Sequence, residues 1–270
     1  MKDNYSEKQD VFNYWNEESC GTHLTKEKKF SKEYFTEIED KRYSLEPFIK
    51  PFAQFDQYKD KNVLEVGVGA GTDFINWLRN GAIATGIDLT DEAIENVNHR
   101  LNIEGLHAKR LEKTDVESLP FSENEFDLVY SWGVIHHSPN TFKALEEIVR
   151  VTKPNGEIKI MIYNRYSVAA FWVWVRHCLL KGQFWKSITY AVANYVESPG
   201  TKAYTKSEAK ELFLSMPVKI ISIENVLTWC DLAITSKYNV VRLIHRILAR
   251  IGGGNRVGWF MLIKAVKSVE

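Results

Sequence analysis

The stretch Val63-Leu64-Glu65-Val66-Gly67-Val68-Gly69-Ala70-Gly71-Thr72 decides the fold of this 270-residue chain. Its apolar half predicts a short buried strand, and a helical pattern follows over 73–80. The glycines between them permit the positive φ angles and the close backbone approach that a ligand-binding loop needs. A strand, a glycine loop and a helix in this order predict a ligand at the carboxyl edge of a sheet.

Strands and helices alternate outward from this loop. Further strands are predicted over 83–87, 107–111, 126–130, 158–163, 218–226 and 257–266, with helices over 90–101 and 141–151. Such alternation is typical of right-handed βαβ crossovers around one sheet. The sequence therefore predicts an α/β fold: a doubly wound, Rossmann-like, seven-stranded and mostly parallel sheet, with an N-terminal helical cover and helical cap insertions.

Four segments follow from this reading. We expect a helical cover over 1–60, the ligand-binding core over 61–164, a helical cap insertion over 165–216, and the last core strands over 217–270. The final segment contains a basic amphipathic helix, 238–251, in which Arg242, Arg246 and Arg250 recur every four residues.

The neutral net charge hides a division of the chain. Residues 1–157 carry a net charge of −10 and residues 158–270 a net charge of +10. A basic second half indicates an anionic partner or surface, or simple attraction to the acidic half. Helix 238–251 could accordingly lie on an anionic membrane, meet an anionic substrate, or present a solvated basic face, which is the most ordinary interpretation.

Cysteine usage and hydropathy favour a cytoplasmic protein, with peripheral contact at the inner membrane surface as an option. The three cysteines lie far apart without CxxC spacing, which argues against a disulfide framework or a cysteine zinc site. The polar N-terminus does not resemble a secretory signal, and no apolar run approaches the ~18 residues of a membrane span.

The glycine loop differs from the dinucleotide-binding fingerprint at two residues. Thr72 stands where GxGxxG requires its third glycine, and Glu65 precedes the loop by two residues. A carboxylate beside the loop would repel a pyrophosphate and favour a cationic ligand. This contrast favours an ammonium- or sulfonium-bearing cofactor over a nicotinamide dinucleotide.

Over about 60–165 and the final strands, the sequence resembles the class I S-adenosylmethionine (SAM)-dependent methyltransferases. The resemblance rests on the glycine loop, on an acid ending the second strand, on Thr114 to Phe121, on Ser131 to His137, and on Lys153 to Glu157. It implies SAM as the cofactor. The cofactor-binding residues that it implies are Glu65, Gly67, Gly69, Gly71, Asp88, Leu89, Asp115, Val116, Ser131 and Trp132.

The catalytic and substrate residues are less sharply indicated. His136 and His137 are candidate general bases, although a turn packing on the cofactor explains them equally well. Tyr163, Asn164 and Arg165 follow the fifth strand, where a substrate could sit, but loop hydrogen bonds are the alternative. We expect no metal site, because the sequence has no HxxxH motif or dense carboxylate cluster.

The sequence thus predicts a SAM-dependent methyltransferase, nearest in style to enzymes that methylate quinones and other small molecules. A small or amphipathic acceptor is expected, with O-, N- and C-methylation all open. RNA methylation and a non-catalytic SAM-binding module are the alternatives; DNA binding is not expected, and the oligomeric state is left open.

Overall fold

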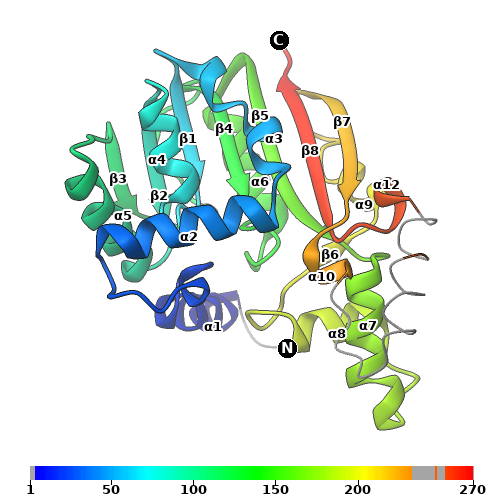
Figure 1. Cartoon of the computed structure of the whole chain (residues 1–270). Helices are drawn as coiled ribbons and strands as arrows, with labels where there is room; N and C mark the ends of the chain where they lie inside the picture. Colours follow the sequence, from blue (N-terminus) through cyan, green and yellow to red (C-terminus); the bar gives the residue numbers. More distant parts are fainter. Residues whose placement is uncertain (1–3, 233–246, 248–252, 270) are drawn as a thin grey trace.

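The computed structural model describes residues 4–232, 247 and 253–269. Its main sheet has the strand order β3-β2-β1-β4-β5-β8-β7 (Figure 1). The strands are β1 Asn62–Val66, β2 Ile83–Asp88, β3 Arg110–Lys113, β4 Phe126–Trp132, β5 Thr152–Asn164, β7 Val218–Val226 and β8 Phe260–Lys267. All run parallel except β8, which is antiparallel to both neighbours. The predicted mostly parallel sheet is confirmed, and a short eighth strand, β6 Ala203–Tyr204, joins the end of β5.

Helices cover both faces of the sheet, as in a doubly wound fold. The helices α3 Ile49–Ala53, α4 Thr72–Arg79 and α5 Asp91–Glu104 pack in one apolar core. The helices α6 Thr141–Val151 and α9 Lys206–Glu211 pack in the other. In α6, Leu145 and Ile148 are fully buried at a spacing of three, which is the amphipathic pattern the sequence shows.

Local signals in the sequence set several element ends. The Thr90 hydroxyl accepts a hydrogen bond from the Ala93 amide and caps α5, which Gly105 ends in a left-handed conformation. Residues 154–156 form a bulge inside β5 rather than a turn before it. The pairing with β4 jumps there from Thr152 to Glu157, and Asn155 takes a φ of 60°.

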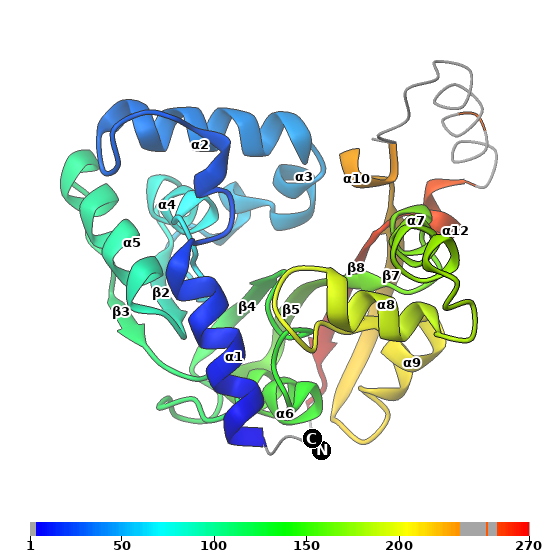
Figure 2. The same cartoon turned by 90° about the horizontal axis from the view of Figure 1, so that it is seen from below.

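The N-terminal cover crosses the carboxyl edge of the sheet. Helix α1 Asn4–Glu17 lies below this edge, and α2 Lys32–Leu45 lies beside α4 and α5 (Figures 1 and 2). The side-chain oxygen of Asn16 accepts hydrogen bonds from the amides of Asp91 and Glu92, at the start of α5. The 3-10 helix η1 Thr22–Leu24 lies between α1 and α2, and η2 Phe55–Tyr58 connects the cover to β1.

A helical insertion leaves the sheet at the end of β5 and returns at β6. It contains α7 Val168–His177, η3 Leu179–Lys181 and α8 Ile188–Tyr195. Since β6 pairs with Tyr163 and Asn164 at the end of β5, the returning segment 196–202 is held at the carboxyl edge. The tryptophans of the insertion do not fill its core: Trp172 and Trp185 are exposed.

Two short helices, α10 Trp229–Leu232 and α12 Gly254–Val257, complete the described elements. The predicted basic helix 238–251 lies outside the described residues, apart from position 247. Among the helices that the structure describes, none is long and apolar enough to cross a bilayer.

Candidate active site

The glycine loop between β1 and α4 is held against the end of β2. The amides of Gly67 and Val68 both donate to the Ile87 carbonyl, at 2.8 and 3.2 Å. Gly67 and Gly69 have φ angles of +81° and +50°. A Cβ on Gly67 would lie 2.1 Å from a methyl group of Val134, whereas a Cβ on Gly69 would meet no atom of the described chain within 4 Å. The loop is therefore packed at Gly67 and open at Gly69.

Asp88 ends β2 directly beside this open position. One carboxylate oxygen accepts the Gly69 amide at 3.1 Å, and the other accepts the amide and hydroxyl of Thr90. Burial raises the pKa of Asp88, while these hydrogen bonds oppose the rise. The carboxylate is thereby fixed in orientation at the rim of the loop, where it can accept hydrogen bonds from a ligand.

The loop and Asp88 face a cavity of about 260 Å³ at the carboxyl edge of the sheet. Most of the predicted cofactor residues line it: Glu65, Gly67, Gly69, Asp88, Leu89, Asp115, Val116 and Trp132. Gly71 and Ser131 are not part of the lining that the described residues form. Gly71 is the N-cap of α4, and Ser131 is fully buried within β4. The structure thus brings eight of these ten residues to one cavity.

Glu65 lies on the floor of the cavity and is almost fully buried. Its carboxylate accepts a hydrogen bond from the indole of Trp77 at 2.7 Å. Burial and the neighbouring Asp73 raise the pKa of Glu65 well above its ordinary value. Asp73 itself accepts the hydroxyls of Tyr43 and Tyr130, at 3.0 and 2.9 Å. Two acids therefore share the floor. The Arg42 guanidinium lies 3.5 Å from Asp73, whereas Glu65 makes no ion pair among the described residues and could face a cationic ligand group.

Buried polar atoms on the cavity wall lack partners. The Nε of Arg42 and one carboxylate oxygen of Glu46 are buried without a hydrogen bond to any described residue, and both side chains line the cavity. Buried polar atoms of this kind point to a ligand or ordered water. SAM carries an ammonium, a carboxylate and ribose hydroxyls, so the open Gly69 position, the acidic floor and these unpaired atoms fit it.

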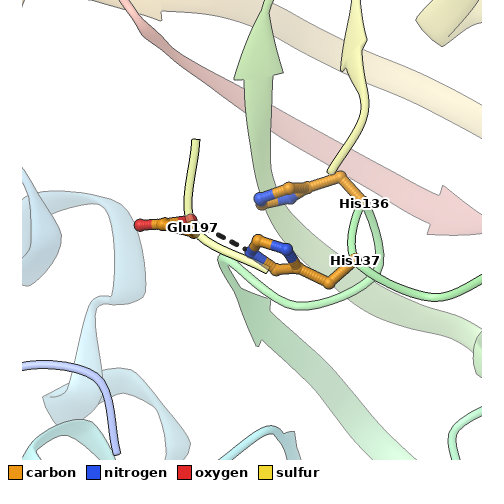
Figure 3. Close-up of side chains that lie close together, drawn as sticks. All are labelled: His136, His137 and Glu197. Carbon is orange, nitrogen blue, oxygen red and sulfur yellow. Dashed lines mark ion pairs between the residues drawn. The ribbon is translucent and has the colours of Figure 1, made fainter. Parts of the chain in front are cut away.

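The far end of the cavity holds a second polar group, made of His137, Tyr163 and Glu197. Figure 3 shows the pair of His137 and Glu197. The Nε2 of His137 lies 3.2 Å from a Glu197 carboxylate oxygen, which also accepts the Tyr163 hydroxyl at 2.7 Å. Burial and the Glu197 charge raise the pKa of Tyr163 well above its ordinary value, so the phenol keeps its proton. We call this set the acceptor end of the cavity.

His136 occupies a different position from His137. It is fully buried and absent from the cavity lining of the described chain, and its ring packs between His137 and Tyr163 with centroids 4.2 and 4.0 Å away. Burial and the neighbouring His137 hold the pKa of His136 well below its ordinary value. Of the two predicted bases, the one that reaches the cavity is His137.

Two of the three predicted substrate residues point elsewhere. Among the described residues, Tyr163 lines the cavity but Asn164 and Arg165 do not. The Asn164 amide donates to the carbonyls of Arg256 and Gly258. Arg165 donates to the Ala203 carbonyl and to Glu208. These bonds fix the base of the insertion. Side chains alternate across the end of β5, so Asn164 points away from the face of Tyr163, whereas Arg165 lies beyond the strand and is held by its own hydrogen bonds.

Helix α1 also contributes residues to the cavity, which the sequence did not predict. Lys8, Val11 and Trp15 lie at helical spacing and line the cavity together. Lys8 pairs with Asp115 and with Glu117, which lie on the loop after β3. The spacing of three and four between one basic and two apolar residues could have indicated that these side chains share one helix face. Only the fold shows that this face covers the cavity, with Lys8 at the cofactor end and Trp15 beside His137, their ring centroids 5.2 Å apart.

The sheet order, the glycine loop and the acid after β2 define the Rossmann-like class of ligand-binding domains. Comparison with known proteins narrows the class. Residues 64–160 match a family described as a methyltransferase domain. The core of this chain is a class I SAM-dependent methyltransferase domain.

Characterised relatives match over the same core. A phthiotriol/phenolphthiotriol dimycocerosates methyltransferase of Mycobacterium ulcerans is 37% identical over 98 residues, which are 36% of this chain and 35% of that protein. A fatty-acid O-methyltransferase of Mycolicibacterium smegmatis is 34% identical over 117 residues, which are 43% of this chain and 41% of that protein. The chain thus spans about two fifths of the length of the curated relatives it matches.

A solved structure extends the likeness in fold. Geranyl diphosphate C-methyltransferase from Streptomyces coelicolor A3(2) superposes with a TM-score of 0.62, at 15% identity. The superposition covers 97% of this chain and 98% of that one. At this identity the likeness concerns the fold alone, including the elements outside the core.

Proposed function

We propose that this protein transfers a methyl group from SAM to a small or amphipathic acceptor. The observation that carries the proposal is a single cavity with two chemically different ends. One end has the open Gly69 position and the fixed Asp88 carboxylate, and the other has the polar group around His137.

In this proposal, differently charged residues at the cofactor end bind different parts of SAM. Asp88 would accept the ribose hydroxyls, and the segment Asp115-Val116 would flank the adenine. The acidic floor at Glu65 would face the cationic part of the cofactor, while Arg42 would face its carboxylate. When bound, SAM supplies an electrophilic methyl group.

The acceptor end supports a substrate with an apolar body and one polar head. Apolar residues that line the cavity include Trp15, Leu45, Met161, Trp229, Trp259 and Phe260. The ring of Trp15 lies 5.2 Å from that of His137, and the rings of Trp259 and Phe260 lie 4.1 and 5.7 Å from that of Tyr163. Their surfaces would exclude water from the transfer, and Tyr163 would orient the head. His137 is the residue placed to accept a proton from an oxygen or nitrogen acceptor. The two relatives named for lipid substrates support an amphipathic acceptor.

The test combines binding with turnover. We expect calorimetry to show one molecule of SAM, or of its demethylated product S-adenosylhomocysteine (SAH), bound per chain. Asp88→Ala should weaken this affinity at least tenfold, because it removes two charge-assisted hydrogen bonds that contribute about 1.5–3 kcal/mol each. Mass spectrometry of SAM reactions with fatty acids and quinols would then identify a methylated product. Binding without any turnover across acceptors would favour the non-catalytic module, and methylation of RNA alone would favour the RNA alternative.

The proposal extends to the membrane through helix 238–251, on the sequence alone. Reversing Arg242, Arg246 and Arg250 to Glu is expected to abolish sedimentation with anionic vesicles. If the unaltered protein never sediments with such vesicles, the helix has no role at the membrane.

A further inference from the structure

A group of metal-ligating side chains lies at and behind the acceptor end. His136 and His137 come from the loop after β4, and Glu197 comes from the segment that returns from the insertion (Figure 3). One potential ligand atom from each residue lies within 4.8 Å of the other two. Glu197 lies sixty residues after His137 in the sequence, so no short sequence motif predicts this group.

The imidazole of His136 is the first reason to expect a bound ion. Both of its ring nitrogens are buried, and neither has a hydrogen-bond partner in the described part of the chain. Leaving a buried polar group unsatisfied costs about 1–3 kcal/mol. Buried groups of this kind in a native protein indicate a ligand that completes them, such as an ordered water or an ion.

The pair of His137 and Glu197 is the second reason. The Nε2 of His137 lies 3.2 Å from the Glu197 oxygen, yet it makes no hydrogen bond within the described chain. Two atoms that bind one ion at 2.0–2.2 Å lie about 2.8–3.6 Å apart, so this separation matches that of two ligands. Glu197 also has a φ of 50°, a left-handed conformation that is uncommon for glutamate.

The hydrogen bonds of the other His137 nitrogen prepare Nε2 for this role. The hydroxyls of Ser198 and Thr201 lie 2.9 and 3.0 Å from His137 Nδ1. Since the Thr201 hydroxyl donates to the Ser198 carbonyl at 2.6 Å, its lone pairs can accept a proton from Nδ1. A proton on Nδ1 leaves a lone pair on Nε2 of the neutral ring. An outer hydrogen bond that selects the tautomer is a common feature of histidine metal ligands.

We propose that His136, His137 and Glu197 bind one divalent transition-metal ion of the zinc type. Two imidazoles and one carboxylate suit such an ion, whereas Mg²⁺ prefers oxygen ligands alone. Three protein ligands leave a coordination position for water or substrate. Binding requires the three ligand atoms to close from within 4.8 Å to about 3 Å, a separation that the Nε2 of His137 and the Glu197 oxygen, 3.2 Å apart, already have.

The use of the ion rests on the proposed function, although its binding does not. An ion at this place would polarise an acceptor hydroxyl at the far end of the cavity and favour its ionised form. Nε2 of His137 cannot bind an ion and accept a proton at once. In the metal-loaded protein the ion therefore replaces His137 as the means of activating the acceptor.

The experiment titrates the full chain, treated with a chelator and dialysed, with Zn²⁺ by calorimetry. We expect one Zn²⁺ per chain and no comparable uptake of Mg²⁺. Glu197→Gln keeps an oxygen for the Tyr163 hydroxyl but removes the charged ligand, so Zn²⁺ affinity should fall at least tenfold. The matched control is Glu95→Gln, because Glu95 and His99 form an exposed pair 3.9 Å apart. This control should leave the affinity unchanged within about twofold, since exposed pairs contribute little.

His136→Phe separates ligation from folding. Phenylalanine keeps an aromatic ring between His137 and Tyr163 and removes two unsatisfied nitrogens, so the metal-free variant should melt at least as high as the unaltered protein. Its Zn²⁺ affinity should nevertheless fall at least tenfold. Equal Zn²⁺ affinity in this variant or in Glu197→Gln overturns the three-ligand site, as does uptake no stronger than that of Mg²⁺. SAH binding, measured in parallel, reports separately on the cofactor end and the proposed function.

Discussion

Substituting Gly69 with alanine tests the cofactor end, because the structure separates the effect on ligand from the effect on fold. Gly69 has a φ of +50°, and the added Cβ meets nothing in the described chain within 4 Å. A left-handed non-glycine residue costs about 1–2 kcal/mol. We therefore expect Gly69→Ala to lower the free energy of unfolding by that amount and to leave the fold intact.

The same methyl group would occupy space that the cofactor needs. Inserting one methyl group into a packed contact costs typically 1–3 kcal/mol, which corresponds to a Kd raised about 5- to 150-fold. Calorimetric titration with SAH measures this directly. The larger change Gly69→Arg should abolish binding altogether.

Gly105→Ala is the matched control. Gly105 ends α5 with a φ of +63°, also has open space at its Cβ among the described residues, and is not one of those that line the cavity. Urea denaturation should show similar losses of stability in the two variants, while SAH affinity falls in Gly69→Ala alone. Equal SAH affinities in both variants would refute the assignment of this loop to the cofactor.

Three further outcomes can be checked on the same protein. Lys8→Met removes the ion pair with Asp115, so limited proteolysis should cleave α1 faster, and SAH should slow this cleavage. Burial lowers the pKa of Lys159 to about 8 from an ordinary 10.5, so the unfolded chain binds more protons than the folded chain between these two pH values. The free energy of unfolding, measured in urea titrations, should therefore rise by up to about 3 kcal/mol from pH 8 to 10.5. Lys159→Met should flatten this rise. Desolvation raises the thiol pKa of the half-buried Cys230 to about 12. Iodoacetamide should therefore alkylate Cys230 slowly at pH 8, as followed by mass spectrometry, and fast alkylation would contradict this raised pKa.

The parts of the site that the sequence predicts are local in the chain. The glycine loop, the acid that ends β2 and the Thr90 cap each depend on residues within a few positions of one another. Short apolar runs likewise identified most of the strands, because these are buried within the sheet, and the 3.6-residue period identified α6, because that helix buries one face against the sheet. Such features can be predicted from the sequence because the residues that cause them are close together in the chain or follow a regular pattern.

The parts that the sequence does not predict depend on contacts across the fold. Glu197 meets His137 because β6 returns to the end of β5, and nothing in either segment signals that pairing. Asn164 and Arg165 follow a strand end as substrate residues would. Their hydrogen bonds to the segments around 203 and 256–258 are equally invisible in a linear reading.

The division between core and surroundings also explains what the relatives can say about this protein. The cofactor residues that line the cavity from Glu65 to Trp132 all fall within the matched segment 64–160. Other lining residues fall outside it, on α1, α2, the end of β5, the insertion, α10 and the start of β8, although His137 of the acceptor end falls inside it. A shared core with different surroundings is a physical basis for one methyl donor and many acceptors. Differences in substrate among proteins with this domain should therefore follow residues such as Trp15, Tyr163 and Glu197, and exchanging these should change the acceptor while SAH affinity stays within a few-fold.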